Sequence, residues 1–452
     1  MPKILILNYH VELPLVSDIP DRYPNHLGRA CTRAMWYADA DDIVVSPVDL
    51  DKEFFAYVAG TAGYDLDSVT VLARGRKLYD DVLLEEDLVA ALRDRVAGDA
   101  SWTLMPCNMT EGVAELARLL GIDTGTEWEF AAERGADLLN RKSHFRQLAV
   151  GTGLPLAPGA IVRSPEGLLR AVNSLLAETG TVVVKQDNAA GGAGNIAFTS
   201  AGPLTPLPGV RETRPVPADL AAAAALWAEL TEAQEPVLVV ESYHDAVHAF
   251  FFEYFVGKGG RVEFLSNPGF KRRLTEKNGV PSWEWIGLEI PADVPAATLG
   301  EALTHAAWFA AAVAALGQRG YMNMDVIVTD DGRLIFNEIN ARWSGGLVPH
   351  TIGTRLLGRR YADHHVLTSV RNIKPASFPA TIDALRSRGI HFDPESGEGI
   401  VVVAHGPADT DKTECIAIAK SRRRAHELEE LVGEVLQIGE GVEEAERAVA
   451  VY

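Results

Sequence analysis

The segment from Tyr321 to Gly346 constrains the fold most, because two apolar, strand-like runs flank a pair of turn-forming residues. The pair is Asp331 and Gly332, and Asp-Gly is a favoured two-residue hairpin loop because both residues tolerate positive φ. A loop of that length places Asp330 opposite Arg333. The segment therefore predicts an antiparallel hairpin whose register can be counted outward from its turn.

That count predicts a cluster of polar side chains on one face of the hairpin. Asp325 falls opposite Glu338, and Asn323 falls opposite Asn340. Facing residues have Cβ atoms about 4.5–5.5 Å apart, so two carboxylates placed there repel each other. A divalent cation reverses that sign, and Mg²⁺ takes hard oxygen ligands from a carboxylate or two, phosphates and water. Asp325, Glu338 and Asn340 are thus candidate metal ligands. The alternative is a surface hairpin with a solvated polar face, and the apolar strands and the Arg342 that follows favour the metal site.

Two lysines and a glycine-rich loop are candidates for phosphate binding. Lys185 ends a β-branched run, and the loop 188–195 follows it. Backbone N–H groups of such a loop can close over phosphates. A flexible surface loop is the alternative, and Lys142 taken alone fits an exposed helix residue. The glycines concerned are Gly191, Gly192 and Gly194.

A buried strand at 237–243 leads out to polar positions. The end of such a strand can present backbone N–H and C=O groups to an adenine edge, with Glu241 accepting from the exocyclic amine. A strand-terminating surface glutamate is the alternative. The basic run Lys271–Arg273 is a candidate for phosphate or carboxylate binding, or a solvated charge cluster.

The order of predicted elements divides the chain into four parts. Residues 1–125 alternate strands and helices, which favours an open α/β domain with a mainly parallel sheet. Residues 126–240 and 241–372 hold the candidate site, and 354–371 are expected to be helical. Residues 373–452 are expected to form a small separate β-β-α unit.

Composition narrows the class of protein. The formal charge is -20, which repels a nucleic-acid backbone. The three cysteines are odd in number and form no CxxC pair, so a disulfide framework is not expected and a reducing cytoplasm fits better. The N-terminal apolar run of four residues is too short for a signal peptide, and no stretch approaches the ~20 apolar residues of a membrane span. We therefore expect a cytoplasmic protein that binds neither nucleic acid nor membrane.

Taken in order from Asn140 to Gly346, these features resemble the ATP-grasp family. The resemblance implies an α/β fold in which an N-terminal open domain precedes two subdomains that clamp ATP. It also implies a role for each matching position. Lys142 and Lys185 contact the phosphates beneath a glycine-rich lid, and the hinge at the adenine comprises Val239–Tyr243, with Glu241, Ser242 and Tyr243 in contact. Asp325, Glu338 and Asn340 hold Mg²⁺, for which Mn²⁺ is an alternative, and Arg342 stabilises the transferred phosphoryl group or the acyl phosphate.

Two positions depart from the pattern of the D-alanine–D-alanine ligase relatives. Those ligases hold the ribose with an acidic residue seven positions beyond the hinge glutamate, where this chain has His248, with Asp245 nearby. They also carry a basic residue two positions before the first metal aspartate, where this chain has Asn323. The oxyanion contact therefore falls to Arg342 or to Lys271–Arg273, with Asn323 retained as a candidate catalytic position.

Within the family, the layout is most similar to the pheganomycin-type peptide ligases of natural-product biosynthesis. The resemblance implies that a small carboxylic acid is activated as an acyl phosphate and passed to an amine or peptide acceptor, with release of ADP and phosphate. It also makes a homodimer an expectation. Alternatives are an ATP-grasp enzyme with a thioester or phosphorylated product and a non-catalytic nucleotide-binding protein. The general base stays open among four candidates, His144, His244, His248 and His350.

Overall fold

The computed structural model describes residues 2–9, 30–97, 99, 101–122, 127–189, 192, 194–200, 204, 207–232, 236–277, 280–374, 376–405 and 413–436. The side chains of 276–284 and 372 lie outside this description. Gly191, a predicted phosphate contact, also lies outside the described residues.

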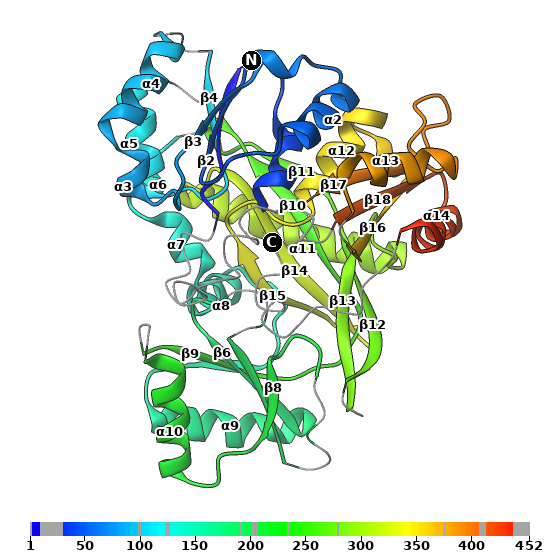
Figure 1. Cartoon of the computed structure of the whole chain (residues 1–452). Helices are drawn as coiled ribbons and strands as arrows, with labels where there is room; N and C mark the ends of the chain where they lie inside the picture. Colours follow the sequence, from blue (N-terminus) through cyan, green and yellow to red (C-terminus); the bar gives the residue numbers. More distant parts are fainter. Residues whose placement is uncertain are drawn as a thin grey trace.

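The N-terminal domain is a four-stranded parallel sheet in the order β3-β2-β1-β4, as the alternation of elements predicted (Figure 1). Helix α5 of this domain is capped at both ends. Thr110 Oγ1 accepts from the N–H of Val113 at its start, and Gly121, in the left-handed region, ends it. The strands are β1 (Lys3–Ile6), β2 (Ile43–Ser46), β3 (Thr70–Ala73) and β4 (Thr103–Pro106), and the helices are η2 (Met35–Tyr37), α2 (Lys52–Ala62), η3 (Leu66–Ser68), α3 (Asp80–Leu83), α4 (Glu86–Val96) and α5 (Glu111–Leu120).

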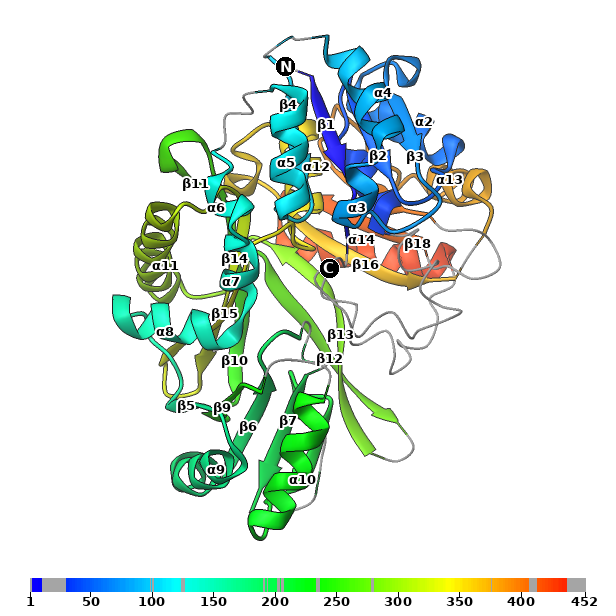
Figure 2. The same cartoon turned by 90° about the vertical axis from the view of Figure 1, so that its left-hand side faces the viewer.

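A smaller sheet forms a subdomain that projects from the rest of the molecule (Figures 1 and 2). Its strand order is β5-β9-β6-β7-β8, and two helices pack on it over a core of their own. The strands are β5 (Gly159–Val162), β6 (Thr181–Gln186), β7 (Asn195–Thr199), β8 (Glu212–Pro215) and β9 (Leu238–Ser242), and the helices are α9 (Pro165–Thr179) and α10 (Leu220–Thr231). The expected boundary at residue 240 falls inside β9, because the sheet continues to Ser242.

Three short helices connect the two regions: α6 (Glu129–Ala132), α7 (Gly135–Asn140) and α8 (Lys142–Thr152). Their buried side chains, among them Leu139 and Phe145, belong to the largest core and not to that of the small sheet. Helix α8 therefore packs with the largest core. Its first residue, Lys142, lies where this core meets the small sheet.

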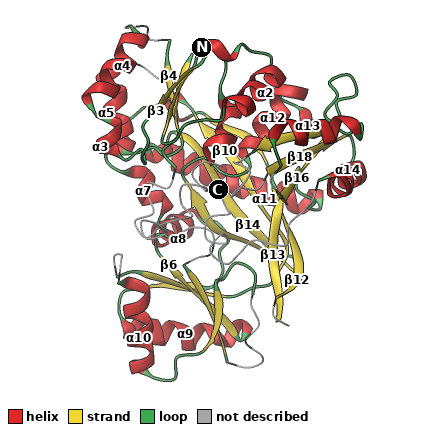
Figure 3. Cartoon of the chain, in the orientation of Figure 1, coloured by secondary structure: helices red, strands yellow, loops and turns green. Residues whose placement is uncertain are grey.

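The largest sheet has nine strands in the order β15-β14-β10-β12-β13-β16-β18-β17, with β11 paired to β10 (Figure 3). The strands are β10 (Ala246–Val256), β11 (Val262–Ser266), β12 (Gly269–Lys277), β13 (Val280–Ile290), β14 (Gly320–Thr329), β15 (Leu334–Asn340), β16 (Val366–Ile373), β17 (Gly399–Ala404) and β18 (Thr413–Ala419). The remaining helices are η4 (Lys258–Gly260), α11 (Ala296–Leu316), α12 (Leu347–Leu357), η5 (Tyr361–Asp363), α13 (Phe378–Ser387) and α14 (Arg422–Val435).

Two expectations for the C-terminal region are corrected. Residues 366–373 form a strand, β16, and not the end of a helix over 354–371, because they pair with both β13 and β18. The β-β-α unit beyond 373 does not make a sheet of its own. Its strands β17 and β18 extend the nine-stranded sheet through β16, so the boundary expected at 373 does not interrupt the sheet.

Helix α11 differs from the expectation that no segment could span a bilayer. By length and composition alone its 21 residues are apolar enough to do so. The same length and composition also fit a core helix, and α11 buries Phe309 and Val313 in the largest core. Trp308 on its other side is 76% exposed.

Candidate active site

The hairpin β14–β15 has the predicted face-to-face pairs. Asp325 pairs with Glu338, and Asn323 pairs with Asn340. All four side chains lie on the face of the sheet opposite the core residues Met324 and Ile339.

The turn of this hairpin differs from the two-residue loop that was expected. Val328 pairs with Leu334, and the N–H of Thr329 donates to Arg333 O at 3.0 Å, which leaves a three-residue loop at 330–332. Gly332 has φ 82°, as such a loop requires. A bulge between Asp325 and Val326 then shifts the register by one residue, so the longer loop and the bulge cancel at the carboxylate pair.

The surroundings of Asp325 and Glu338 shift their pKa values in opposite directions. Burial and then the Glu338 carboxylate hold the pKa of Asp325 well above its usual range. Burial also acts to raise the pKa of Glu338, but Lys142, Lys185 and Arg342 outweigh it and lower that pKa. Lys142 Nζ lies 3.2 Å from Glu338 Oε2. Nearby cations therefore compensate Glu338 more fully than Asp325, and an added cation beside Asp325 would favour its carboxylate form.

The donor set fits a magnesium ion that is shared with phosphates. Among the described residues no group of three or more His, Cys, Asp or Glu could hold a metal. Two carboxylates and the amide oxygen of Asn340 are the sparse oxygen set that Mg²⁺ takes when phosphates and waters complete its shell. Arg342 is 8% exposed, and its Nη1 donates to Asn340 Oδ1 at 2.6 Å, while Asn340 Nδ2 donates to Asn323 Oδ1 at 3.0 Å. This brings the predicted catalytic Arg342 and Asn323 next to the acids.

Lys142 is buried, unlike the exposed helix lysine that was its alternative. It is the first residue of α8, its backbone N–H donates to Asp187 O at 3.0 Å, and its Nζ donates to Ala189 O. The N–H of Ser143 donates to Asp187 Oδ1 at 2.7 Å. These contacts fix the start of α8 against the loop that follows β6, and they hold the ammonium group beside Glu338.

Lys185 and Glu241 meet on neighbouring strands of the small sheet. Lys185 Nζ lies 2.6 Å from Glu241 Oε2, and Arg146 Nη1 donates to Glu241 Oε1 at 2.8 Å. Both carboxylate oxygens of Glu241 are thus engaged, so here Glu241 holds Lys185 in place. Its contact with an adenine amine stays a prediction. Sequence reasoning missed Arg146, although its position four residues after Lys142 places both on one face of α8.

The predicted hinge uses its backbone differently from what was expected. Strand β9 is flanked by β5 and β6, so the N–H of Ser242 donates to Pro158 O and the N–H of Tyr243 donates to Thr181 O, both at 2.9 Å. Those two N–H groups are therefore not free for an adenine edge. Ser242 Oγ is buried without a hydrogen-bond partner among the described residues, and Tyr243 OH donates to Pro208 O at 3.1 Å.

The glycine-rich loop connects antiparallel strands, with Lys185 paired to Asn195. Gly192 has φ +78°, and a Cβ there would lie 2.8 Å from Gly209 O. Gly194 accepts from the N–H of Gln186 at 2.9 Å, and a Cβ there would lie 2.4 Å from Ala189 Cβ. Both positions therefore require glycine for packing.

Two predicted binding residues lie apart from the carboxylates. His248 pairs with Val328, three residues along β14 from Asp325, and its ribose contact stays a prediction. Lys271 Nζ donates to Thr368 Oγ1 at 2.6 Å and pairs with Glu429, so it joins β12 to α14 and is not available as the oxyanion contact.

The acids and amides lie at a pocket beneath strands β12 and β13. Aromatic and aliphatic side chains cover the polar face of the hairpin, and the pocket is lined by Phe251, Phe270, Trp285, Leu288, Asn323, Asp325, Glu338, Asn340, Arg342, Trp343, Ser344 and Gly345. The pocket thus combines apolar walls with a few convergent charged and amide groups.

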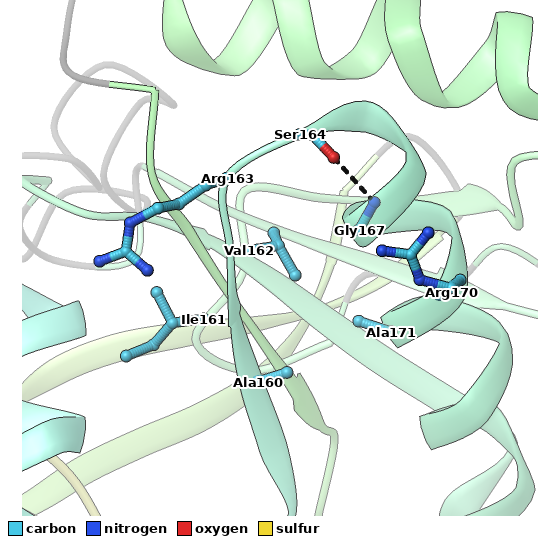
Figure 4. A pocket seen from close by; sticks show the side chains of 8 residues that line it. All are labelled: Ala160, Ile161, Val162, Arg163, Ser164, Gly167, Arg170 and Ala171. Carbon is cyan, nitrogen blue, oxygen red and sulfur yellow. Dashed lines mark hydrogen bonds between the residues drawn. The ribbon is translucent and has the colours of Figure 1, made fainter.

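A second pocket lies on the small subdomain, between β5 and the start of α9 (Figure 4). Ser164 Oγ accepts from the N–H of Gly167 at 3.1 Å, which caps α9. Arg163 and Arg170 lie on opposite sides of this pocket. It shares no residue with the carboxylate pocket, and we assign it no role.

Comparisons with known proteins were made by sequence and by structure. Residues 31–122 match the family described as the Pre ATP-grasp domain, and residues 380–432 match the PGM1 C-terminal domain. No curated protein matches the sequence.

Solved structures resemble the whole chain at low identity. Biotin carboxylase from Campylobacter jejuni, in a β-γ-ATP complex, is 14% identical, with 99% of this chain and 94% of that chain covered and a TM-score of 0.57. The biotin carboxylase domain of Hydrogenobacter thermophilus 2-oxoglutarate carboxylase, in complex with MgADP, is 15% identical, with 98% and 91% covered and a TM-score of 0.56. L-amino acid ligase from Bacillus licheniformis is 11% identical, with 96% and 97% covered and a TM-score of 0.51. Likeness at these identities establishes the fold alone, and the predicted fold class is confirmed: the chain has an α/β ATP-grasp fold, and residues 31–122 within it match the Pre ATP-grasp domain.

Proposed function

We propose that this protein is an ATP- and Mg²⁺-dependent ligase that joins a carboxylic acid to an amine through an acyl phosphate. The observation that carries the proposal is the facing pair Asp325 and Glu338, with Lys142 Nζ 3.2 Å from the Glu338 carboxylate. The ATP and MgADP complexes of the two biotin carboxylase structures support the choice of nucleotide and metal. Mn²⁺ is the alternative cation.

The first step is phosphoryl transfer from ATP to the acid. A carboxylate oxygen of the substrate attacks the γ-phosphorus, the bond to the ADP oxygen breaks, and ADP leaves. Lys142, Lys185 and Arg342 supply positive charge around the phosphoryl oxygens, and positioning and electrostatics do most of the work in such transfers. When bound, Mg²⁺ would be held by Asp325, Glu338 and Asn340 and would neutralise phosphate charge.

The second step is acyl transfer to the amine. The amine nitrogen attacks the acyl carbon, the C–O bond to phosphate breaks, and the amine loses a proton as the amide forms. Among the candidate bases, burial lowers the pKa of His350 to about 4, and its Nδ1 lies 3.2 Å from Tyr361 OH. His144 Nδ1 lies 3.2 Å from Leu138 O. We assign the base to none of the four histidines.

We further infer that the acceptor is an amino acid or peptide and that the reaction serves natural-product peptide biosynthesis. The resemblance of the motif order between Asn140 and Gly346 to pheganomycin-type peptide ligases supports this inference. A cytoplasmic homodimer is part of the same proposal.

A substrate screen tests the reaction class. Carboxylic acids are incubated with Mg-ATP and hydroxylamine, and ADP and acyl hydroxamate are measured. We expect ADP and hydroxamate with at least one acid, and release of AMP would overturn the acyl-phosphate route.

A matched pair of variants tests the site. Glu338→Gln removes a charge at the proposed metal, and we expect it to abolish turnover with the fold intact. Asp330→Asn removes a charge from the exposed turn of the same hairpin, and we expect near-normal turnover. Near-normal turnover of Glu338→Gln would refute the assignment of this carboxylate.

A further inference from the structure

Glu253 is a buried acid that the reaction described above does not use. The residue is 1% exposed, and its Oε1 accepts no hydrogen bond from the described residues. Burial, followed by the negative charge of Asp325, holds the pKa of Glu253 well above its usual range. A buried carboxyl oxygen that accepts no hydrogen bond costs stability. A protein can retain such a destabilising group when a bound ligand donates the missing hydrogen bond.

Glu253 belongs to a row of polar residues that crosses four strands. On β10 it pairs with Asn323 of β14 on one side and with Ser266 of β11 on the other, and Asn323 pairs with Asn340 of β15. Directly paired residues share a sheet face, so this row lies on the face that carries the proposed metal ligands. Ser266 Oγ is also buried without a hydrogen-bond partner among the described residues.

The distance from Glu253 to the carboxylate pair of Asp325 and Glu338 suits a small molecule with two functional groups. Phe251, Asp325 and Glu338 form the adjacent row on the same face, two residues further along each strand. Two residues of a strand span about 7 Å. A charge-assisted contact of about 2.8 Å from Glu253 would place a ligand nitrogen between the rows. The other end of the same molecule would then reach the phosphoryl acceptor position beside Asp325.

Three tyrosines from different segments lie within electrostatic reach of Glu253. After burial, the charge of Glu253 is the largest influence that raises the pKa of Tyr37 in η2, Tyr321 in β14 and Tyr361 in η5, which places all three phenols near it. The ring of Tyr37 lies 4.7 Å from that of Trp343, which lines the carboxylate pocket. An acid among aromatic rings is a typical environment for an organic cation.

Arg33, a cation that acts on Tyr37, already has an acidic partner. Arg33 influences Tyr37, but its Nε donates to Glu414 Oε2 at 2.8 Å. A second magnesium ion fits poorly, because Glu253 is the only carboxylate among the described residues of this polar row. An ammonium group needs only one carboxylate and a few acceptors.

We propose that Glu253 binds the ammonium group of the substrate whose carboxylate is activated, so that the acid substrate is an amino acid. This inference rests on the proposed ligase function and specifies its acid. The ammonium group donates to the Glu253 carboxylate within the aromatic surround, and Asn323 and Ser266 flank the contact. The carboxylate of the same molecule lies toward Asp325 and Glu338 for phosphorylation.

The first test compares substrates on the wild-type protein. The twenty common L-amino acids and their α-hydroxy analogues are each supplied with Mg-ATP and hydroxylamine, and ADP and hydroxamate are measured. We expect activation of one or more amino acids and a kcat/KM at least about tenfold lower for the matching hydroxy acids, as expected for loss of a charge-assisted contact. Equal or better activation of the hydroxy acids would overturn the inference while leaving the ligase function standing. Absence of ADP with every acid would refute the proposed function itself.

The second test removes the charge and keeps the shape. Glu253→Gln should raise KM for the amino acid at least about tenfold, leave KM for the hydroxy analogue nearly unchanged, and leave the Kd for ADP unchanged. Glu263→Gln on the adjacent strand β11 is the matched control, because Glu263 is only partly buried and lies next to Phe255, beyond the polar row. The ratio of KM for the amino acid to KM for the hydroxy analogue is the quantity to compare. If Glu253→Gln leaves this ratio and the melting temperature unchanged, Glu253 does not bind the ammonium group.

Discussion

Lys185 and Glu241 form a buried ion pair across β6 and β9, with 2.6 Å between Lys185 Nζ and Glu241 Oε2. Lys185 is 8% exposed and Glu241 is 6% exposed. Arg146 engages the second carboxylate oxygen, so one acid compensates two cations from different elements. The triad thereby fixes Lys185, for which we propose phosphate binding, without a nucleotide.

Removing the acid of this triad should destabilise the protein. In Glu241→Gln, Lys185 and Arg146 lose their shared counter-charge in a buried site, and we expect a loss of about 3–5 kcal/mol in the free energy of unfolding. Urea denaturation followed by circular dichroism measures it. Glu229→Gln, which removes an exposed partner of Arg211 and Arg214, should cost less than about 1 kcal/mol. Similar losses in the two variants would contradict the structural role of Glu241.

Asp325→Asn should separate stability from function. Without metal, the substitution relieves the repulsion between Asp325 and Glu338, so the melting temperature in EDTA should be equal to or above that of the wild type. Mg-ATP should raise the melting temperature of the wild type, because a ligand that binds only the folded state stabilises it. The variant should lose most of this rise. A full rise in Asp325→Asn would show that this carboxylate is not needed for metal-nucleotide binding.

Arg342→Lys should lower kcat more than it changes the KM for ATP. The lysine keeps a positive charge but loses the planar donor that reaches Asn340 Oδ1, and removal of one donor that stabilises developing charge costs about 10²–10³ in rate. Steady-state ADP release measures both constants. The control is Arg359→Lys, whose side chain is 84% exposed, and it should match the wild type. A change in the KM for ATP with an unchanged kcat would indicate that Arg342 binds the ground state and does not stabilise the transition state.

His350 should make stability depend on pH on the acid side. Burial lowers its pKa to about 4 from an ordinary value of 6.5, so the folded state favours the neutral ring. Its contribution is therefore present above pH 6.5 and is lost as pH falls toward 4, by up to about 3 kcal/mol.

The comparison of two histidine variants checks this sign. His350→Gln should flatten the fall of unfolding free energy between pH 6.5 and 4, whereas His364→Gln at an exposed position should leave it unchanged. The slope is the quantity to compare, because His350→Gln also alters the contact with Tyr361 OH. An unaltered slope in His350→Gln would contradict the buried neutral imidazole.

The hairpin at 320–340 shows which features of the site can be predicted from the sequence. The pairing of Asp325 with Glu338 followed from the alternation of side chains along a strand, which is a local property of the backbone. The loop was one residue longer than predicted, and the bulge beside Asp325 restored the register. The predicted pairing of the carboxylates was therefore correct because the longer loop and the bulge cancelled. The alternation of side chains along a strand predicts neither of these two features.

Signals that lie within a few residues were recovered from the sequence alone: the strands of the first domain, the end of α5 at Gly121 and the facing acids of the hairpin. Three features depended on contacts between segments far apart in the chain. Residues 366–373 form a strand because β13 and β18 pair with them. Glu241 is the counter-ion of Lys185 and Arg146, and Glu253 is buried away from solvent. Backbone periodicity and capping act over one or two turns, so the sequence carries them directly, whereas strand partners and desolvation of a charge exist only once the chain has folded.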